Sequence, residues 1–133
     1  MGSHKIKRNK EVVLNYVSAI NNADILEMDK IMSNDLLYID SAGKEYRGKE
    51  VMIQAWITYF TMFPDYKIEV TEITENDAMI GLFGSASGTF NEKKTAYYRL
   101  PAAWKVIVRE GNIVHWQVYC ESKKIEEIMK KYI

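Results

Sequence analysis

The chain has 133 residues, of which 47% are hydrophobic and 27% are charged; this is typical of one soluble domain with its own core. Lys and Arg together number 18, as do Asp and Glu. Because this balance leaves no strongly basic surface, we expect no nucleic acid among the partners.

The single cysteine, Cys120, excludes an internal disulfide and indicates a reducing compartment, so we expect a cytoplasmic protein. No apolar run approaches the ~20 residues that span a bilayer, and the N-terminus lacks the apolar core of a signal peptide. We therefore expect no membrane association. Residues 1–4 are interpreted as a tag remnant or a disordered start, and residues 5–133 as one domain.

The N-terminal part of the chain predicts two helices. Residues 5–21 carry an apolar stripe at helical spacing, formed by Val12, Val13, Tyr16, Val17 and Ile20. Asp24 is the expected N-cap of a second, short helix, with Glu27 as its reciprocal capping partner. Ser33-Asn34-Asp35 is expected to end that helix.

An apolar run then leads into a turn. Residues 36–40 are expected to form a short strand, Asp40-Ser41-Ala42-Gly43 a turn, and residues 44–47 a returning strand. After Gly48, the wide apolar face of residues 49–63 predicts a third helix. Pro64 is expected to end it.

From Tyr66 onward the apolar residues alternate, which predicts strands. Residues 78–90 form a long expected strand whose internal glycines are typical of a curled sheet. A hairpin tip is expected at residues 91–94, a strand bent or interrupted at Pro101 over 95–109, and a last strand over 113–120. Ser122 is the expected cap of a final helix.

Together these elements predict an α+β fold. A curved, cone-shaped antiparallel sheet is expected to wrap over about three N-terminal helices, with a short C-terminal helix. The open end of such a cone is a common place for a ligand.

Several short motifs resemble the nuclear transport factor 2-like superfamily, which contains ketosteroid isomerases and SnoaL-like polyketide cyclases. They are the first helix with its turn Asn21-Asn22-Ala23-Asp24, the segment Tyr38-Ile39-Asp40-Ser41-Ala42-Gly43, the tripeptide Phe63-Pro64-Asp65 and the hairpin Arg109–Val114. Their order and spacing imply the cone-shaped fold, and a homodimer formed through the outer face of the sheet.

The resemblance also implies catalytic residues. Tyr16 matches the tyrosine that donates a hydrogen bond to the enolate oxygen in ketosteroid isomerases, and Asp40 matches the aspartate that moves the proton. The second oxyanion donor of that family, a protonated aspartic acid, has no counterpart. Ala103 or Trp104 occupies its place, and Trp104 would supply an indole N–H donor under one alignment only.

Each candidate has a plainer structural interpretation. Asp40 in apolar surroundings would accept a proton readily, or it would simply cap its turn by accepting a backbone N–H hydrogen bond. Tyr16 would act on a ligand, or it would be a core phenol with a hydrogen-bond partner. Glu121 would face the pocket, or it would only precede the cap at Ser122.

The rest of the expected pocket comes from the third helix and the last strands. By alternation and resemblance, its residues are Trp56, Phe60, Trp104, Trp116, Val118, Cys120 and Glu121. The two histidines, His4 and His115, lack metal-ligand spacing, and no phosphate-binding glycine loop is present. We therefore expect neither a metal nor a cofactor.

Three functions remain open from the sequence. The first is a cofactor-free isomerase or cyclase that moves a proton next to a carbonyl group of a small apolar or cyclic organic ligand. The second is a binding protein without catalysis. The third is a dimerising scaffold whose own side chains fill the cavity.

Overall fold

The computed structural model describes residues 2–92 and 96–132; Lys93 and Lys94 of the expected hairpin tip, with Thr95, lie outside them. The helices are α1 (Gly2–Asn21), α2 (Ile25–Ile31), α3 (Lys49–Met62) and α4 (Lys123–Tyr132), with a 3-10 turn, η1, at Phe90–Glu92. The strands are β1 (Met32–Ile39), β2 (Glu45–Arg47), β3 (Lys67–Asn76), β4 (Met79–Thr89), β5 (Tyr97–Arg109) and β6 (Asn112–Cys120).

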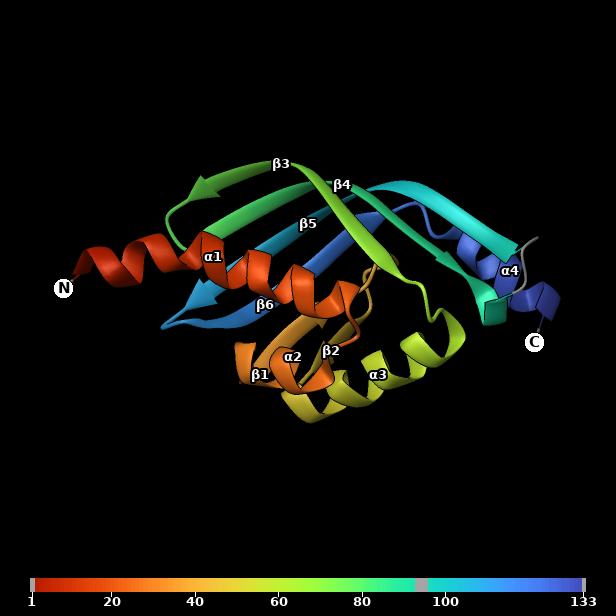
Figure 1. The fold of residues 1–133 in the computed structure, drawn as a ribbon, viewed down its shortest axis with the longest axis horizontal. Helices are drawn as coiled ribbons and strands as arrows, with labels where there is room; N and C mark the ends of the chain where they lie inside the picture. The colour runs from red at the N-terminus through yellow and green to blue at the C-terminus, as the bar shows by residue number, and fades with distance from the viewer. Residues whose placement is uncertain (1, 93–95, 133) are drawn as a thin grey trace.

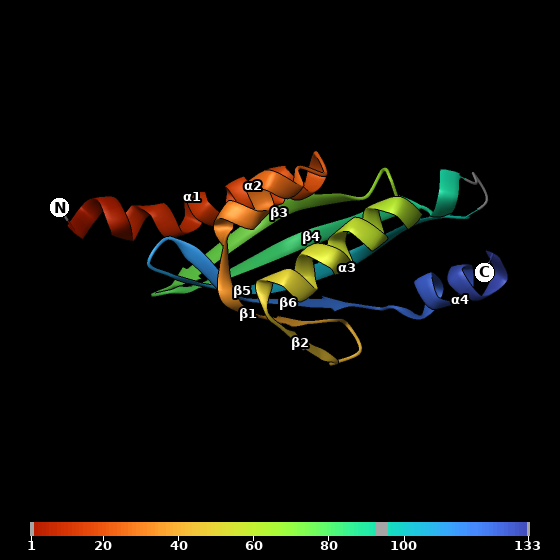
Figure 2. The same cartoon turned by 90° about the horizontal axis from the view of Figure 1, so that it is seen from below.

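The strands form one six-stranded sheet in the order β2-β1-β6-β5-β4-β3. Neighbours are antiparallel except β1 and β6, which run parallel. The sheet curves around α1, α2 and α3, and α4 lies at the far end (Figures 1 and 2). This confirms the predicted α+β fold. No helix of the described chain combines the length and apolar character needed to cross a membrane.

Helix α1 is held against the sheet by its predicted stripe and by its last residue. Val13, Tyr16, Val17 and Ile20 are all buried, as the helical spacing requires. The Asn21 side chain donates to the carbonyl oxygen of Ile68 (2.9 Å) and accepts from its backbone N–H (2.7 Å). An amide side chain thus pairs with the start of β3 as a neighbouring strand would.

The structure corrects two predictions, one about where β1 begins and one about whether Pro101 interrupts β5. Ser33-Asn34-Asp35 does not form a loop after α2, because β1 begins at Met32, which pairs with Ile113 of β6. The register with β6 shifts between Met32 and Leu37, so Ser33-Asn34-Asp35 form an irregular stretch inside β1 and not a separate turn. Pro101 does not interrupt β5. It pairs with Ser85 of β4, whereas the pairing of β5 with β6 begins only at Ala102. The missing N–H of Pro101 therefore costs no hydrogen bond to β6.

The tripeptide Phe63-Pro64-Asp65 has a structural role. Phe63 caps the end of α3 and is fully buried. The Asp65 carboxylate accepts hydrogen bonds from the backbone N–H and the hydroxyl of Thr89, both at 2.7 Å. These bonds attach the connection between α3 and β3 to the end of β4.

The sheet is tightest at Gly84, where β3 carries a bulge between Val70 and Glu72. A Cβ atom on Gly84 would lie 1.7 Å from the carbonyl oxygen of Glu69. No side chain fits there without displacement of the β3 backbone, so glycine at this position is a requirement of the strand pairing.

We predict that Gly84→Ala lowers the free energy of unfolding by about 3 kcal/mol, because the added methyl group overpacks the bulge. Urea denaturation followed by circular dichroism measures this loss. The adjacent substitution Ser85→Ala is the control and should change stability by less than about 0.5 kcal/mol. Equal effects of the two substitutions would contradict the close approach.

Candidate functional site

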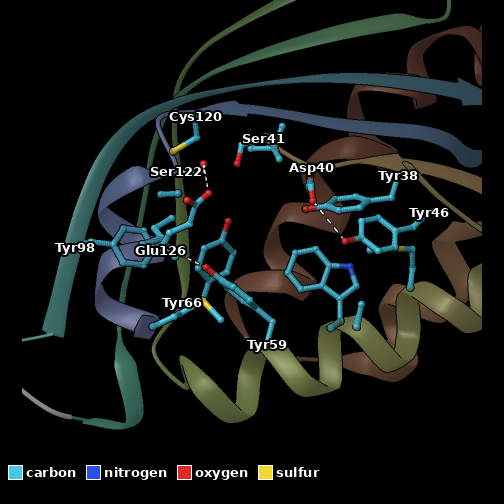
Figure 3. A pocket seen from close by; sticks show the side chains of 17 residues that line it. Tyr38, Asp40, Ser41, Tyr46, Tyr59, Tyr66, Tyr98, Cys120, Ser122 and Glu126 are labelled. Carbon is cyan, nitrogen blue, oxygen red and sulfur yellow. Dashed lines mark hydrogen bonds between the residues drawn. The ribbon is translucent and has the colours of Figure 1, made fainter. Parts of the chain in front are cut away.

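A cavity of ≈ 400 Å³ opens between the turn after β1, helix α3, the inner face of the sheet and helix α4. Figure 3 shows its polar side chains converging from these elements. Its wall is mainly aromatic and aliphatic, with two carboxylates, Asp40 and Glu126, and no Lys, Arg or His among the described lining residues. Such a wall suits a small organic molecule with few polar groups.

Asp40 lies where β1 ends, and its carboxylate is fixed by the turn. Oδ1 accepts hydrogen bonds from the backbone N–H groups of Ala42 and Lys44, both at 2.9 Å. The turn is closed by the backbone bonds from Asp40 N–H to the oxygen of Lys44 and from Gly43 N–H to the oxygen of Asp40. The predicted capping role is therefore present.

The second carboxylate oxygen of Asp40 is less engaged. Oδ2 has one contact, with the hydroxyl of Tyr46 at 3.5 Å, which is at the limit of a hydrogen bond. Asp40 also lines the cavity. One oxygen is thus held by the backbone while the other remains able to accept a proton or a hydrogen bond.

Tyr16 lies in the core and is not among the described residues that line the cavity. It is 1% exposed, its hydroxyl accepts a hydrogen bond from Trp56 Nε1 (3.2 Å), and its ring meets Trp116 edge-on. Burial raises the pKa of the Tyr16 phenol well above its ordinary value. The structure therefore does not bring Tyr16 and Asp40 together at one cavity surface.

The other predicted pocket residues divide into two groups. Trp56, Val118 and Cys120 line the cavity. Phe60 stacks behind Trp56, with ring centroids 5.3 Å apart, and Trp104 and Trp116 are core residues, each 2% exposed. Glu121 accepts a hydrogen bond from the backbone N–H of Lys123 at the start of α4.

Sequence reasoning missed the feature that dominates the cavity wall, which is a set of five tyrosines: Tyr38, Tyr46, Tyr59, Tyr66 and Tyr98. Tyr38 lies within the apolar run that ends at Asp40, and Tyr66 begins the alternating region, so both positions carry a sequence signal. Their common destination could not be inferred, because it depends on how α3 and the sheet pack.

Two of these phenols form a hydrogen bond with each other. The hydroxyl oxygens of Tyr59 and Tyr98 are 2.7 Å apart. Burial raises the pKa of both, and it also raises the pKa of the Cys120 thiol. These groups therefore stay neutral around pH 7, and the acidic side chains of the cavity wall are Asp40 and Glu126.

Helix α4 completes the wall. Ile125, Glu126 and Met129 line the cavity, and the Ser122 hydroxyl donates to Glu126 Oε2 at 3.1 Å. Within the described residues, no three His, Cys, Asp or Glu side chains group in a way that could hold a metal ion.

Comparisons with known proteins agree on the fold. Residues 13–116 match the family model of the SnoaL-like domain, whereas no curated protein matches the chain. A structure assigned as a SnoaL-like polyketide cyclase from Shewanella denitrificans OS-217 superimposes with a TM-score of 0.80 at 10% identity, covering 92% of this chain and 97% of that chain.

Two further structures have different described activities or ligands. An LEH-like epoxide hydrolase from M. tuberculosis superimposes with a TM-score of 0.80 at 13% identity, covering 95% of this chain and 92% of that chain. A protein from Catenulispora acidiphila DSM 44928 with a ketosteroid isomerase-like fold, in complex with trimethylamine, gives 0.74 at 17%, covering 82% and 84%. At such identities the likeness shows the fold alone.

We predict that Asp40→Ala destabilises the protein by about 2 kcal/mol, because two backbone N–H groups lose their acceptor. Asp40→Asn keeps an acceptor oxygen of the same shape and should cost less than about 1 kcal/mol. Urea denaturation distinguishes the two. Equal losses would mean that the negative charge, and not the acceptor geometry, maintains the turn.

Proposed function

The chain belongs to the SnoaL-like domain family, and from this premise we propose that it acts on a small, largely apolar organic molecule by moving a proton with Asp40. The volume and the mainly apolar wall of the cavity support a ligand that is small and has few polar groups. The proton-transfer role rests on one observation. The Asp40 carboxylate is anchored through Oδ1 by two backbone N–H groups, while Oδ2 has only a 3.5 Å contact with Tyr46.

The proposed step is abstraction of a proton from a carbon next to a carbonyl group. Asp40 Oδ2 takes the proton, the C–H electron pair forms a C=C bond, and the carbonyl π pair moves onto oxygen to give an enolate. Return of the proton to another carbon would isomerise the molecule. A base held at a fixed position typically contributes ~10²–10⁴ in rate.

The relatives support small-molecule chemistry in general terms. Among the structures with this fold are those described as a polyketide cyclase, an epoxide hydrolase and a trimethylamine complex. They differ in what they act on or bind, so the lining of this cavity, and not the activity of the relatives, indicates the class of substrate.

Binding without catalysis is the second candidate. It is favoured by the turn bonds, which give Asp40 a purpose without any reaction. It is also favoured by Trp104, which would supply an indole donor under one alignment only and which is a core residue, 2% exposed. A scaffold with a filled cone is disfavoured by the cavity volume of ≈ 400 Å³.

We predict that the wild-type protein in D₂O accelerates deuterium exchange at the α-carbons of 2-indanone, a compact cyclic ketone, above the buffer rate. Asp40→Asn should slow the protein-dependent exchange at least ~100-fold, because the amide cannot accept the proton. NMR of the ketone measures the rate.

The matched control is Asp35→Asn, on the same strand but not among the cavity-lining residues, and it should exchange like the wild type. Exchange that survives in Asp40→Asn would exclude Asp40 as the base. A wild-type protein that binds the ketone without accelerating exchange would reject catalysis and support binding without catalysis.

We also propose that the chain is a cytoplasmic homodimer formed through the outer face of the sheet. Phe83 of β4, Ala103 of β5 and Tyr119 of β6 are cross-strand partners, and Phe83 and Tyr119 are 43% and 49% exposed. An apolar row across three strands is a suitable surface for a second copy.

We predict that the double substitution Phe83→Lys with Tyr119→Lys converts the dimer to a monomer, because it places like charges across the interface. Light scattering after size exclusion measures the mass. Leu26→Lys, at a 78% exposed site on α2, is the control and should remain dimeric. A wild type that is monomeric at the same concentration would contradict the dimer.

A further inference from the structure

The hydroxyl of Tyr66 has no hydrogen-bond partner within the described chain, although the residue is only 9% exposed. Tyr16 accepts from Trp56, and Tyr59 and Tyr98 bond to each other. Buried phenols normally have a partner, and an unpartnered polar group in a protein interior costs free energy. The lack of a partner for the Tyr66 hydroxyl within the described chain therefore needs an explanation.

Tyr66 lines the cavity, and its hydroxyl points into it between the elements that carry Asp40 and Cys120 (Figure 3). The ring is held in place: it meets Tyr59 edge-on at 5.0 Å and Trp56 at 6.1 Å between centroids. The backbone N–H of Tyr66 is fixed to the oxygen of Phe63. The hydroxyl is thus presented to the cavity by a rigid aromatic cluster.

Tyr38 is the other cavity phenol without a hydrogen-bond partner in the described chain, but it is less enclosed, being half-buried. Water can reach such a group and satisfy it. The enclosed hydroxyl of Tyr66 is the stronger candidate for a ligand contact.

The Tyr66 phenol is suited to donate a hydrogen bond and not to transfer its proton. Burial, followed by the influence of Tyr59, raises its pKa well above the ordinary value. The hydroxyl of Tyr66 therefore stays protonated around pH 7.

We propose that the Tyr66 hydroxyl donates a hydrogen bond to the carbonyl oxygen of the ligand, so that the ligand class is a compact carbonyl compound. This inference rests on the proposed function and assigns to Tyr66 the donor role that the sequence resemblance gave to Tyr16. When Asp40 takes the α-proton, negative charge grows on that carbonyl oxygen, and a preplaced donor stabilises it.

The binding test compares 2-indanone with indane, which has the same rings but no carbonyl group, by ligand-detected NMR. Tyr66→Phe should bind the ketone about tenfold more weakly and indane unchanged, because only the ketone loses a hydrogen bond. Removal of an unpartnered buried hydroxyl should leave the midpoint of urea denaturation unchanged or raise it. A stable variant with weaker ketone binding is not explained by a merely structural role.

The control is Tyr16→Phe, which removes another buried hydroxyl, one that lies outside the described cavity wall. It should lower the denaturation midpoint, because Trp56 Nε1 loses its acceptor, while the ratio of ketone to indane affinity stays at the wild-type value. A Tyr66→Phe variant with the wild-type ratio would overturn the proposal, and so would a Tyr16→Phe variant that alone loses ketone preference.

Binding and exchange together separate this inference from the proposed function. Exchange that depends on Asp40 but not on Tyr66 would overturn the Tyr66 assignment and leave the proton-transfer function standing. Ketone preference that depends on Tyr66 in a protein without exchange would support the Tyr66 contact and reject catalysis by Asp40.

Discussion

The packing of this protein's interior depends on one hydrogen bond between two buried aromatic side chains, Trp56 and Tyr16. The indole N–H of Trp56 reaches the hydroxyl of Tyr16 across 3.2 Å, and that bond joins α3 to α1 under the sheet. It satisfies a phenol that would otherwise be an unpaired polar group in the core. The same bond orients Trp56, whose indole forms part of the cavity wall. One polar contact therefore supports the packing of two helices and the shape of the site.

The site separates the placement of its carboxylate from the walls around it. Asp40 is positioned by the local turn, through backbone N–H groups only a few residues away. The walls come from elements distant in sequence, namely α3, the inner face of the sheet and α4. A local anchor of this kind allows the walls, and with them the ligand, to change while the carboxylate stays in position.

The sequence predicts the fold well because apolar periodicity depends on local geometry. The stripe on α1, the cap at Asp24 and the alternation after Tyr66 each specify an element without knowledge of its partners. Predictions fail where a distant partner decides: Met32 pairs with Ile113 of β6, so β1 begins earlier than the predicted start at Leu36. Tyr16 lies outside the described cavity wall for the same reason, because its surroundings are set by Trp56 and Trp116, which are distant in sequence. Motif spacing identifies residues, but hydrogen-bond partners follow from packing.

The parallel pairing of β1 with β6 has a consequence for the order of folding. The β1–β2 hairpin is synthesised well before its partner strand, because β1 spans Met32–Ile39 and β6 spans Asn112–Cys120. Until β6 leaves the ribosome, one edge of β1 has no strand to pair with, and exposed edges of this kind invite pairing with other chains. Because the turn that carries Asp40 belongs to this hairpin, the cavity around Asp40 is completed only after β6 and α4 have been translated.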